Sequence, residues 1–512
     1  MTFMKSQSAP RRSYLEGSPT GRGLLLTAFC LLLFATSCMV GPKYKRPSAP
    51  VPEVYKETPT DNPQEISNWK QAQPSDALAH GKWWEIFNDP ELNALEEQVS
   101  ISNQNVLAAE AQFREARYAV RIARSNLFPT ISAAPSITNA RVSSNVSALS
   151  KGQQTTYDLP VDLSYQADVW GSIRRSVTAS AESAQSSFAQ LENARLSYQA
   201  ELAQDYFQLR GTDGEWQLLE DTVKSYQDYL KLTQDRFANG VASGADVAQA
   251  QTQLNTARAQ LIDLGVARAQ YEHAVAVLTG KPPAAIQISS GPIKTSPPPV
   301  PVGVPSTLLE RRPDIAANER LMAVANEQVG IAKVAYYPTV SISAAAGVES
   351  LAFLKWISWP SRFWSVGPAV AETIFDAGRR RAAVAQAQAA YDVTVANYRQ
   401  TVLTAFQQVE DNLAALRVLE KEAQAEDEAV KAAQDSLNIS TYQYKAGTAN
   451  YLTVITTQAI LLQDQVQAVN ILTRRMGASV LLIEALGGGW NTSQLPSTQD
   501  VAKPVPVQAS GK

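Results

Sequence analysis

The chain has 512 residues, of which 45% are hydrophobic, and a formal net charge of −3. This balance argues against a nucleic-acid-binding protein, which would carry a basic stripe. Cys30, Cys38, His80 and His273 are the only cysteines and histidines, and they argue against a zinc site built from such ligands.

The first 37 residues have the pattern of an export signal. Basic residues precede the apolar run 23–35, which is too short to span a bilayer. The run ends in Ala35-Thr36-Ser37-Cys38, which resembles a bacterial lipobox, although leucine is usual in place of Ala35. We expect a covalent lipid on Cys38 that tethers the mature chain. The alternative is an ordinary small residue near a cleavage site. Met39, where aspartate could stand, favours the outer membrane by analogy with lipoprotein sorting.

Two segments about 207 to 209 residues apart share one layout, so the chain is a tandem duplication. Leu127-Phe128-Pro129-Thr130 corresponds to Tyr336-Tyr337-Pro338-Thr339, and Val277-Leu278-Thr279-Gly280 corresponds to Glu484-Ala485-Leu486-Gly487. The expected segments, in chain order, are the signal (1–37), an N-terminal arm (38–90), the first repeat (91–280), a proline-rich linker (281–304), the second repeat (305–490) and a flexible C-terminal tail (491–512).

The strand pattern is clearest in residues 157–170, where apolar odd positions alternate with mostly polar even positions. Strict alternation predicts a strand with one apolar and one polar face. The length suits a membrane-spanning strand of about 9–11 residues, with the odd positions facing lipid. A soluble half-buried hairpin is the alternative. Strands are expected at 127–142, 157–170, 336–349 and 363–376.

Long helices are expected elsewhere. Residues 172–238 contain no proline and would reach about 100 Å if fully helical, although Gly211 and Gly214 suggest a break or bend midway. The second copy, 379–446, contains neither glycine nor proline, and a further helix is expected at 448–486. Small residues permit close helix packing. A simple soluble coiled coil is the alternative, but it leaves the two-faced strands unexplained.

Four strands per chain cannot close a membrane barrel. Unpaired backbone groups in lipid cost several kcal/mol each, and about eight strands are the minimum for a barrel of this kind. Two chains would supply eight strands and three would supply twelve. These residues alone do not choose between a dimer and a trimer.

The order and spacing of several motifs resemble the outer membrane factor family, the TolC-like channels. The likeness is closest to the lipoprotein branch that serves resistance-nodulation-division efflux pumps, and it covers the chain from Cys38 to Trp490. The motifs that carry it are Cys38-Met39-Val40-Gly41-Pro42, Trp83-Trp84-Glu85-Ile86-Phe87, Asp168-Val169-Trp170-Gly171, Leu309-Glu310-Arg311-Arg312-Pro313-Asp314 and Ala485-Leu486-Gly487-Gly488-Gly489-Trp490.

The resemblance implies an α+β, TolC-like trimeric channel. Each chain would give four strands to a shared 12-stranded outer-membrane β-barrel, and its long helices to a periplasmic α-helical barrel. An equatorial band between them would include residues 211–224, the N-terminal arm and the C-terminal tail. The implied partners are two further copies of the chain, outer-membrane lipid, a periplasmic adaptor (membrane fusion protein) and an inner-membrane resistance-nodulation-division pump.

The turns between paired long helices are the first candidate sites. Glycine suits the residue that ends a helix with a positive φ, and Gly240 and Gly447 stand at these two turns. By resemblance the turns, with Val241 and Thr448, are tips that contact the adaptor. The alternative is that these glycines only end the helices and make no contact with a partner.

The pore mouth is the second candidate site. By resemblance Leu452 forms a hydrophobic constriction, and Thr453 and Thr456 stand where relatives often carry aspartates. Asp246 matches the acidic partner of a closing ion link, but Ala449 replaces its basic partner. The pore constriction is therefore assigned to Leu452, Thr453, Thr456 and Asp246. Helix–helix packing is the alternative role for Leu452.

The resemblance implies a passive exit duct that exports drugs or other toxic small compounds from the periplasm, and this is the function that we expect. The alternatives are a type I secretion duct and a coiled-coil lipoprotein without a pore. The Arg311-Arg312-Pro313-Asp314 motif and the lipobox favour the drug-pump branch, but the motif itself suits a structural turn at a helix start. Because no phosphate-binding glycine loop or zinc-type helix motif occurs, we expect no enzyme, metal or cofactor beyond the lipid.

Overall fold

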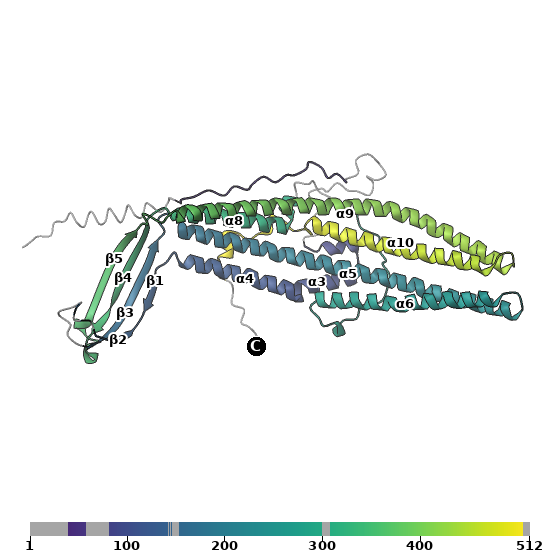
Figure 1. Cartoon of the computed structure of the whole chain (residues 1–512), viewed down its shortest axis with the longest axis horizontal. Coiled ribbons are helices and arrows are strands. Elements are labelled where there is room, and N and C mark those ends of the chain that lie inside the picture. The colour runs from purple at the N-terminus through teal and green to yellow at the C-terminus, as the bar shows by residue number, and fades with distance from the viewer. Residues whose placement is uncertain are drawn as a thin grey trace, which may run out of the picture. The chain divides into compact units, whose positions relative to one another are not determined.

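The computed structural model describes residues 39–57, 81–141, 143, 145, 153–299 and 308–504. Cys38, with its expected lipid, lies outside them. The chain divides into two compact units, and each takes segments from both repeats. Of the described residues, a sheet unit contains those in 39–42, 123–177 and 327–385, and a helical unit contains the others (Figure 1).

The sheet unit holds one antiparallel sheet in the order β1-β3-β4-β5, with β2 also paired to β3. Its strands are β1 (Thr130–Ala133), β2 (Ser136–Arg141), β3 (Gln153–Ala167), β4 (Thr339–Ser350) and β5 (Arg362–Ala371). β1 and β2 share one register on β3, so they occupy a single strand position. The position is interrupted beside Pro135, opposite Pro160, because proline has no N–H for the ladder. The sheet therefore has the four strand positions that the fold class predicted.

The register sorts side chains onto two faces. Residues directly opposite each other in an antiparallel pair lie on the same face, and Leu163 stands opposite both Ile131 and Ala344. One step along, Ser164 stands opposite Thr130 and Ser343. The odd positions of β3 from Tyr157 onward and most of their partners thus form an apolar face, and even positions form a polar one. The apolar face contains Ile131, Ile137, Tyr157, Leu159, Val161, Leu163, Tyr165, Val340, Ile342, Ala344, Ala346, Val348, Trp364, Val366 and Val370.

A buried arginine ties the start of the described chain to the helix ends within the sheet unit. The Arg175 guanidinium lies 2.6 Å from the Glu327 carboxylate and donates to the Val40 carbonyl at 2.7 Å. A Cβ at Gly330 would collide with this guanidinium, so glycine is required there. The Met39-Val40-Gly41-Pro42 motif is therefore a packing motif in this fold.

The helical unit is built mainly from two pairs of antiparallel helices (Figure 1). α5 (Ser172–Ala238) and α9 (Arg379–Lys445) each have 67 residues, and α6 (Gly244–Leu278) and α10 (Tyr451–Ala485) each have 35. The equal lengths are those expected of a duplicated chain. The shorter elements are η2 (Trp83–Phe87), α3 (Pro90–Ser102), α4 (Gln104–Ser125), η3 (Pro283–Ala285), α7 (Leu308–Arg311), α8 (Pro313–Val334), η7 (Thr492–Gln494) and α11 (Thr498–Val501). In the part of the chain that the structure describes, no helix is both long and apolar enough to cross a membrane.

Of the break or bend predicted near Gly211 and Gly214, the break is wrong, because α5 runs through both positions without interruption. A Cβ at Gly211 would collide with the Thr473 side chain of α10. The glycine therefore permits close approach of two helices and does not end one. The stretch 211–224, expected to contribute a segment of an equatorial band, is an internal part of this long helix.

Equivalent joints in the two repeats hold the ends of α6 and α10. Gly280 and Gly487 have φ of +72° and +93°, and a Cβ on either would collide with a backbone carbonyl. Beside them, Asn103 donates to the Leu278 carbonyl at 2.8 Å, and Arg312 donates to the Ala485 carbonyl at 2.9 Å. The Arg311-Arg312-Pro313-Asp314 motif is thus a structural turn, as expected.

The main core of the helical unit gathers the N-terminal arm and the shorter helices around the long ones. Trp83 and Phe87 are fully buried, and Phe87 packs on Phe207 with ring centroids 5.0 Å apart. Glu96 of α3 is also fully buried, and neither of its carboxylate oxygens has a hydrogen-bond partner among the described residues. Burial raises the pKa of Glu96 well above its ordinary value.

The C-terminal segment differs from the sequence-based expectation of a flexible tail beginning at residue 491. α11 begins with a capping box between Ser497 and Asp500, and Val501 is buried in a small cluster with Val120. Arg117 of α4 donates to the Lys503 carbonyl at 3.1 Å. Burial of one valine and these hydrogen bonds hold the segment up to residue 504 on the helices.

Candidate functional site

The two turns between paired helices have the same backbone geometry. In the first, Gly240 donates to the Phe237 carbonyl and Val241 to the Arg236 carbonyl, at 2.9 and 2.8 Å. Gly447 and Thr448 make the equivalent bonds at 3.1 and 2.9 Å. These are paired Schellman bonds, and Gly240 and Gly447 take the left-handed conformation that the motif requires, with φ of +72° and +77°.

The surfaces of both turns are open. Val241 is 63% exposed, Thr448 is exposed, and no atom would meet a Cβ added at either glycine. An exposed valine at a helix tip has no packing role within the chain. Adaptor contact at these tips stays a prediction, and the exposed turns leave the surface available for it.

Side-chain caps start the helix that follows each turn. Ser243 and Asp246 form a reciprocal capping box, in which the Asp246 carboxylate accepts from the Ser243 backbone N–H at 2.9 Å. Asn450 accepts from the Thr453 backbone N–H at 3.1 Å. Asp246 was assigned to the pore constriction, but in this chain its carboxylate is engaged in helix capping. The Ser-x-x-Asp spacing is a sequence signal that could have predicted this role.

The first turns of α10 present two different faces. Tyr451, Val454 and Gln458 are buried against the other long helices. Leu452 is 55% exposed and Thr456 is exposed, one helical turn apart, and the Thr456 hydroxyl donates to the Leu452 carbonyl at 2.9 Å. Packing within the chain therefore does not account for Leu452. Its predicted role at the constriction stays open, together with those of Thr453 and Thr456.

A tyrosine cluster, which the sequence reasoning missed, joins the two helix pairs below the tips. The Tyr444 and Tyr451 rings have centroids 5.3 Å apart, and the Arg236 guanidinium lies over Tyr444 at 4.7 Å. The Tyr229 hydroxyl bonds Thr441 at 2.8 Å. Burial, and next the neighbouring Tyr444, raises the pKa of Tyr451 to about 12. Each repeat contributes residues to the cluster, so it holds the pairs together.

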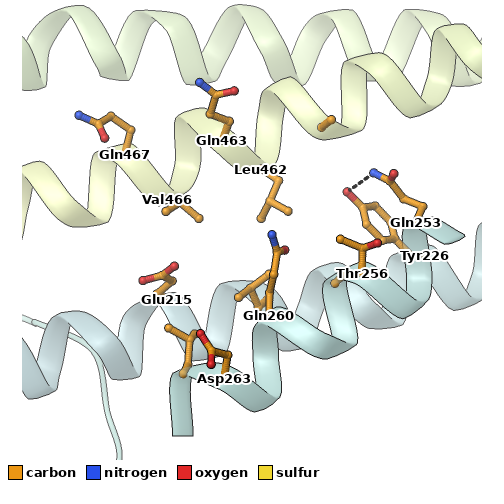
Figure 2. Close-up of a pocket in the computed structure, with 14 residues that line it drawn as sticks. Glu215, Tyr226, Gln253, Thr256, Gln260, Asp263, Leu462, Gln463, Val466 and Gln467 are labelled. Carbon is orange, nitrogen blue, oxygen red and sulfur yellow. Dashed lines mark hydrogen bonds between the residues drawn. The ribbon is translucent and has the colours of Figure 1, made fainter. Parts of the chain in front are cut away.

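A cavity of about 560 Å³ lies between α10 and the α5–α6 pair, farther from the tips than this cluster (Figure 2). Figure 2 shows Gln463 and Gln467 of α10 on one side and Glu215, Gln260 and Asp263 of the other helices on the opposite side. Burial raises the pKa of Glu215. The polar part of the cavity lining therefore includes amides and two carboxylates, which can form hydrogen bonds. None of the lining residues is a nucleophile paired with a base.

A second group of carboxylates faces across α9 and α10. Partial burial and the neighbouring carboxylate of Asp464 raise the pKa of Glu426. Glu422 lies 3.7 Å from Arg474 and accepts from Gln467 at 3.3 Å. Within the described ranges, no group of three or more histidine, cysteine, aspartate or glutamate side chains is placed to hold a metal ion.

The family described as outer membrane efflux protein matches residues 95–281 and 304–488, which are close to the two repeats. The antibiotic efflux pump outer membrane protein ArpC of Pseudomonas putida is 30% identical over 477 residues, 91% of this chain and 95% of that protein. The toluene efflux pump outer membrane protein TtgC, also of Pseudomonas putida, gives the same values.

Among solved structures, the outer-membrane channel OprN superposes with a TM-score of 0.80 at 26% identity, covering 88% of this chain and 100% of that one. The matched ranges, the two-faced sheet and the duplicated helix pairs agree on one assignment. This chain belongs to the outer membrane efflux protein family and has the fold of its TolC-like channels.

Proposed function

We propose that the chain is the outer-membrane exit duct of a tripartite efflux pump, working as a homotrimer through which small toxic compounds leave the periplasm passively. One observation carries the proposal. The sheet has an apolar face, a polar face and two edges, β1 with β2 and β5, each paired on one side only within the described chain. Such edges are not tolerated in lipid, so copies of the chain must pair edge to edge.

Three copies, as the family resemblance implies, supply twelve strand positions. The apolar face then meets lipid and the polar face lines water, which is the arrangement of membrane barrels. The duct needs no catalytic group, and the energy comes from the inner-membrane pump. The relatives named for toluene and for antibiotics support small apolar and amphipathic cargo.

The periplasmic end of the duct is closed by Leu452. Three copies of this exposed leucine, one per chain, meet near the threefold axis, and an apolar ring narrow enough to shed water blocks ions by dewetting. The tips around Val241 and Thr448 contact the adaptor, which couples the duct to a resistance-nodulation-division pump. A lipid on Cys38 adds a tether, and mass spectrometry of the N-terminal peptide tests for it.

Planar-bilayer recording on the purified full-length protein tests the proposal. We expect native mass spectrometry to give the mass of a trimer, and this trimer should resist unfolding in detergent until it is heated. After insertion into the bilayer, we expect discrete single-channel conductance. A monomer, or a trimer that conducts under no applied voltage either as wild type or as Leu452→Ala, would overturn the duct and favour a coiled-coil lipoprotein without a pore.

A further inference from the structure

The connection between β4 and β5, residues 351–361, folds back over the end of the apolar face. The Tyr157 ring, which belongs to that face, lies 5.5 Å from the Phe353 ring and 5.6 Å from the Trp356 ring. The Trp356 indole donates to the Val348 carbonyl at 3.3 Å. Aromatic residues gathered at one level of a membrane strand mark the border between hydrocarbon and headgroups.

An open groove of about 840 Å³ lies on this face. Its lining includes Leu159, Val161 and Ala346 of the strands, together with the loop residues Ile357 and Trp359. Ile357 is 83% exposed and Trp359 is 77% exposed. Large apolar side chains left open around an apolar groove suit a hydrocarbon chain as occupant.

One charged residue, Arg362, is among the residues that line the groove. Arg362 pairs with Val348, so its side chain belongs to that face. The guanidinium lies over the Trp359 ring, and its Nε donates to the Trp359 carbonyl at 3.0 Å. No aspartate or glutamate occurs from residue 351 to 371, where Lys355 is the other charge. An arginine facing lipid is strongly destabilising at the midplane and costs little near the interface, which places Arg362 at headgroup level.

The loop lies at the strand ends that do not join helices. Ala167, at the other end of β3, leads toward α5, and Thr339, which begins β4, follows α8. Under the proposed function the helix-bearing end faces the periplasm, so the 351–361 loop lies at the outer leaflet. Lipids of that leaflet in this type of membrane are phosphorylated glycolipids with several acyl chains.

We propose that the groove binds a phosphorylated glycolipid of the outer leaflet, with an acyl chain along Leu159 and Val161 and a phosphate on Arg362. The guanidinium can give a phosphate two parallel N–H donors, and its contacts with the ring and the carbonyl of Trp359 hold it in place. Lys355 adds a second positive charge at the same level. The inference rests on the proposed function, because it requires the sheet to span the outer membrane.

Native mass spectrometry of the full-length trimer with added lipid A tests this. Four proteins are compared: wild type, Arg362→Ala, Trp359→Ala and the control Arg141→Ala. The control removes an equal charge from the end of β2, outside the groove. Each is titrated with bisphosphorylated lipid A and with the same lipid after enzymatic removal of its phosphates.

We expect Arg362→Ala to weaken binding of the phosphorylated lipid roughly tenfold, the loss of one charge-assisted contact. Trp359→Ala should weaken both lipids, and Arg141→Ala should match wild type. Equal affinity of wild type for the two lipids, or unchanged binding by Arg362→Ala, would overturn the phosphate site. The same spectra report the trimer mass, so a failure of the duct itself is seen separately as a loss of the trimer.

Discussion

Arginine in place of Leu163 should destabilise the membrane-inserted protein far more than arginine at the next residue. Eleven residues of β3, from Tyr157 to Ala167, pair with β4. At about 3.3 Å per residue and a tilt of about 40°, this stretch covers about 28 Å along the membrane normal, close to the apolar band of about 25 Å. Residue 162 is its midpoint, so Leu163 lies near the midplane on the apolar face.

The expected cost of Leu163→Arg is about 2–4 kcal/mol per chain, which changes the folding equilibrium roughly 30- to 1000-fold. Ser164→Arg places the same side chain at nearly the same depth on the polar face, where the cost should be near zero. The free energy of unfolding of both variants is measured by urea unfolding from lipid vesicles, monitored by tryptophan fluorescence and by trimer bands on gels. Equal losses for the two variants, or a larger loss for Ser164→Arg, would show that the faces are wrongly assigned.

Leu452→Ala should raise single-channel conductance and sensitise cells to large antibiotics, and unchanged conductance would place the gate elsewhere. Thr456→Asp should strengthen block by divalent cations applied from the periplasmic side, because carboxylates are good oxygen ligands, and wild type should be blocked weakly. Because the pKa of buried Glu96 is raised, its ionisation costs stability increasingly as pH rises above the unfolded value of about 4.3. Glu96→Gln should therefore raise the melting temperature at pH 8, with the gain fading toward pH 4, and a gain independent of pH would contradict this. Gly211→Ala should cost about 1–3 kcal/mol by overpacking against α10, whereas Gly477→Ala, with no neighbour within 4 Å in the chain, should be neutral or stabilising in the same melting assay.

The contacts of the buried Asp213 could not be predicted from the order of residues along the chain. Asp213 is fully buried and accepts from Arg268 at 2.8 Å and from the Gly291 backbone at 3.0 Å. It therefore fixes the proline-rich linker to α5 and α6. The sequence marks 281–304 as a linker by its prolines, but the partners of Asp213 lie 55 and 78 residues away along the chain. No local periodicity encodes such a contact.

At the pore mouth, too, some features could be predicted from the sequence and others could not. Helix punctuation at Gly240 and Gly447 could be predicted, because the left-handed cap that follows a long helix is a local requirement. Asp246 could also have been understood locally as a capping residue. The tyrosine cluster could not, since Tyr444 and Arg236 come from different repeats and meet only when the helix pairs pack.

The duplicated layout, the strand faces and the helix lengths could be predicted from the amino-acid sequence, because each follows from a periodicity or a spacing within one segment. Three features became visible only in the folded chain: each compact unit draws on both repeats, Gly211 is a contact point inside a continuous helix, and residues 491–504 pack on the helices. Burial of Val501 and close approach at Gly211 are properties of surfaces distant in the chain. Such surfaces are brought together by the hydrophobic effect acting on the whole fold. The residue types of a glycine or a polar tail do not indicate which distant residues they will contact.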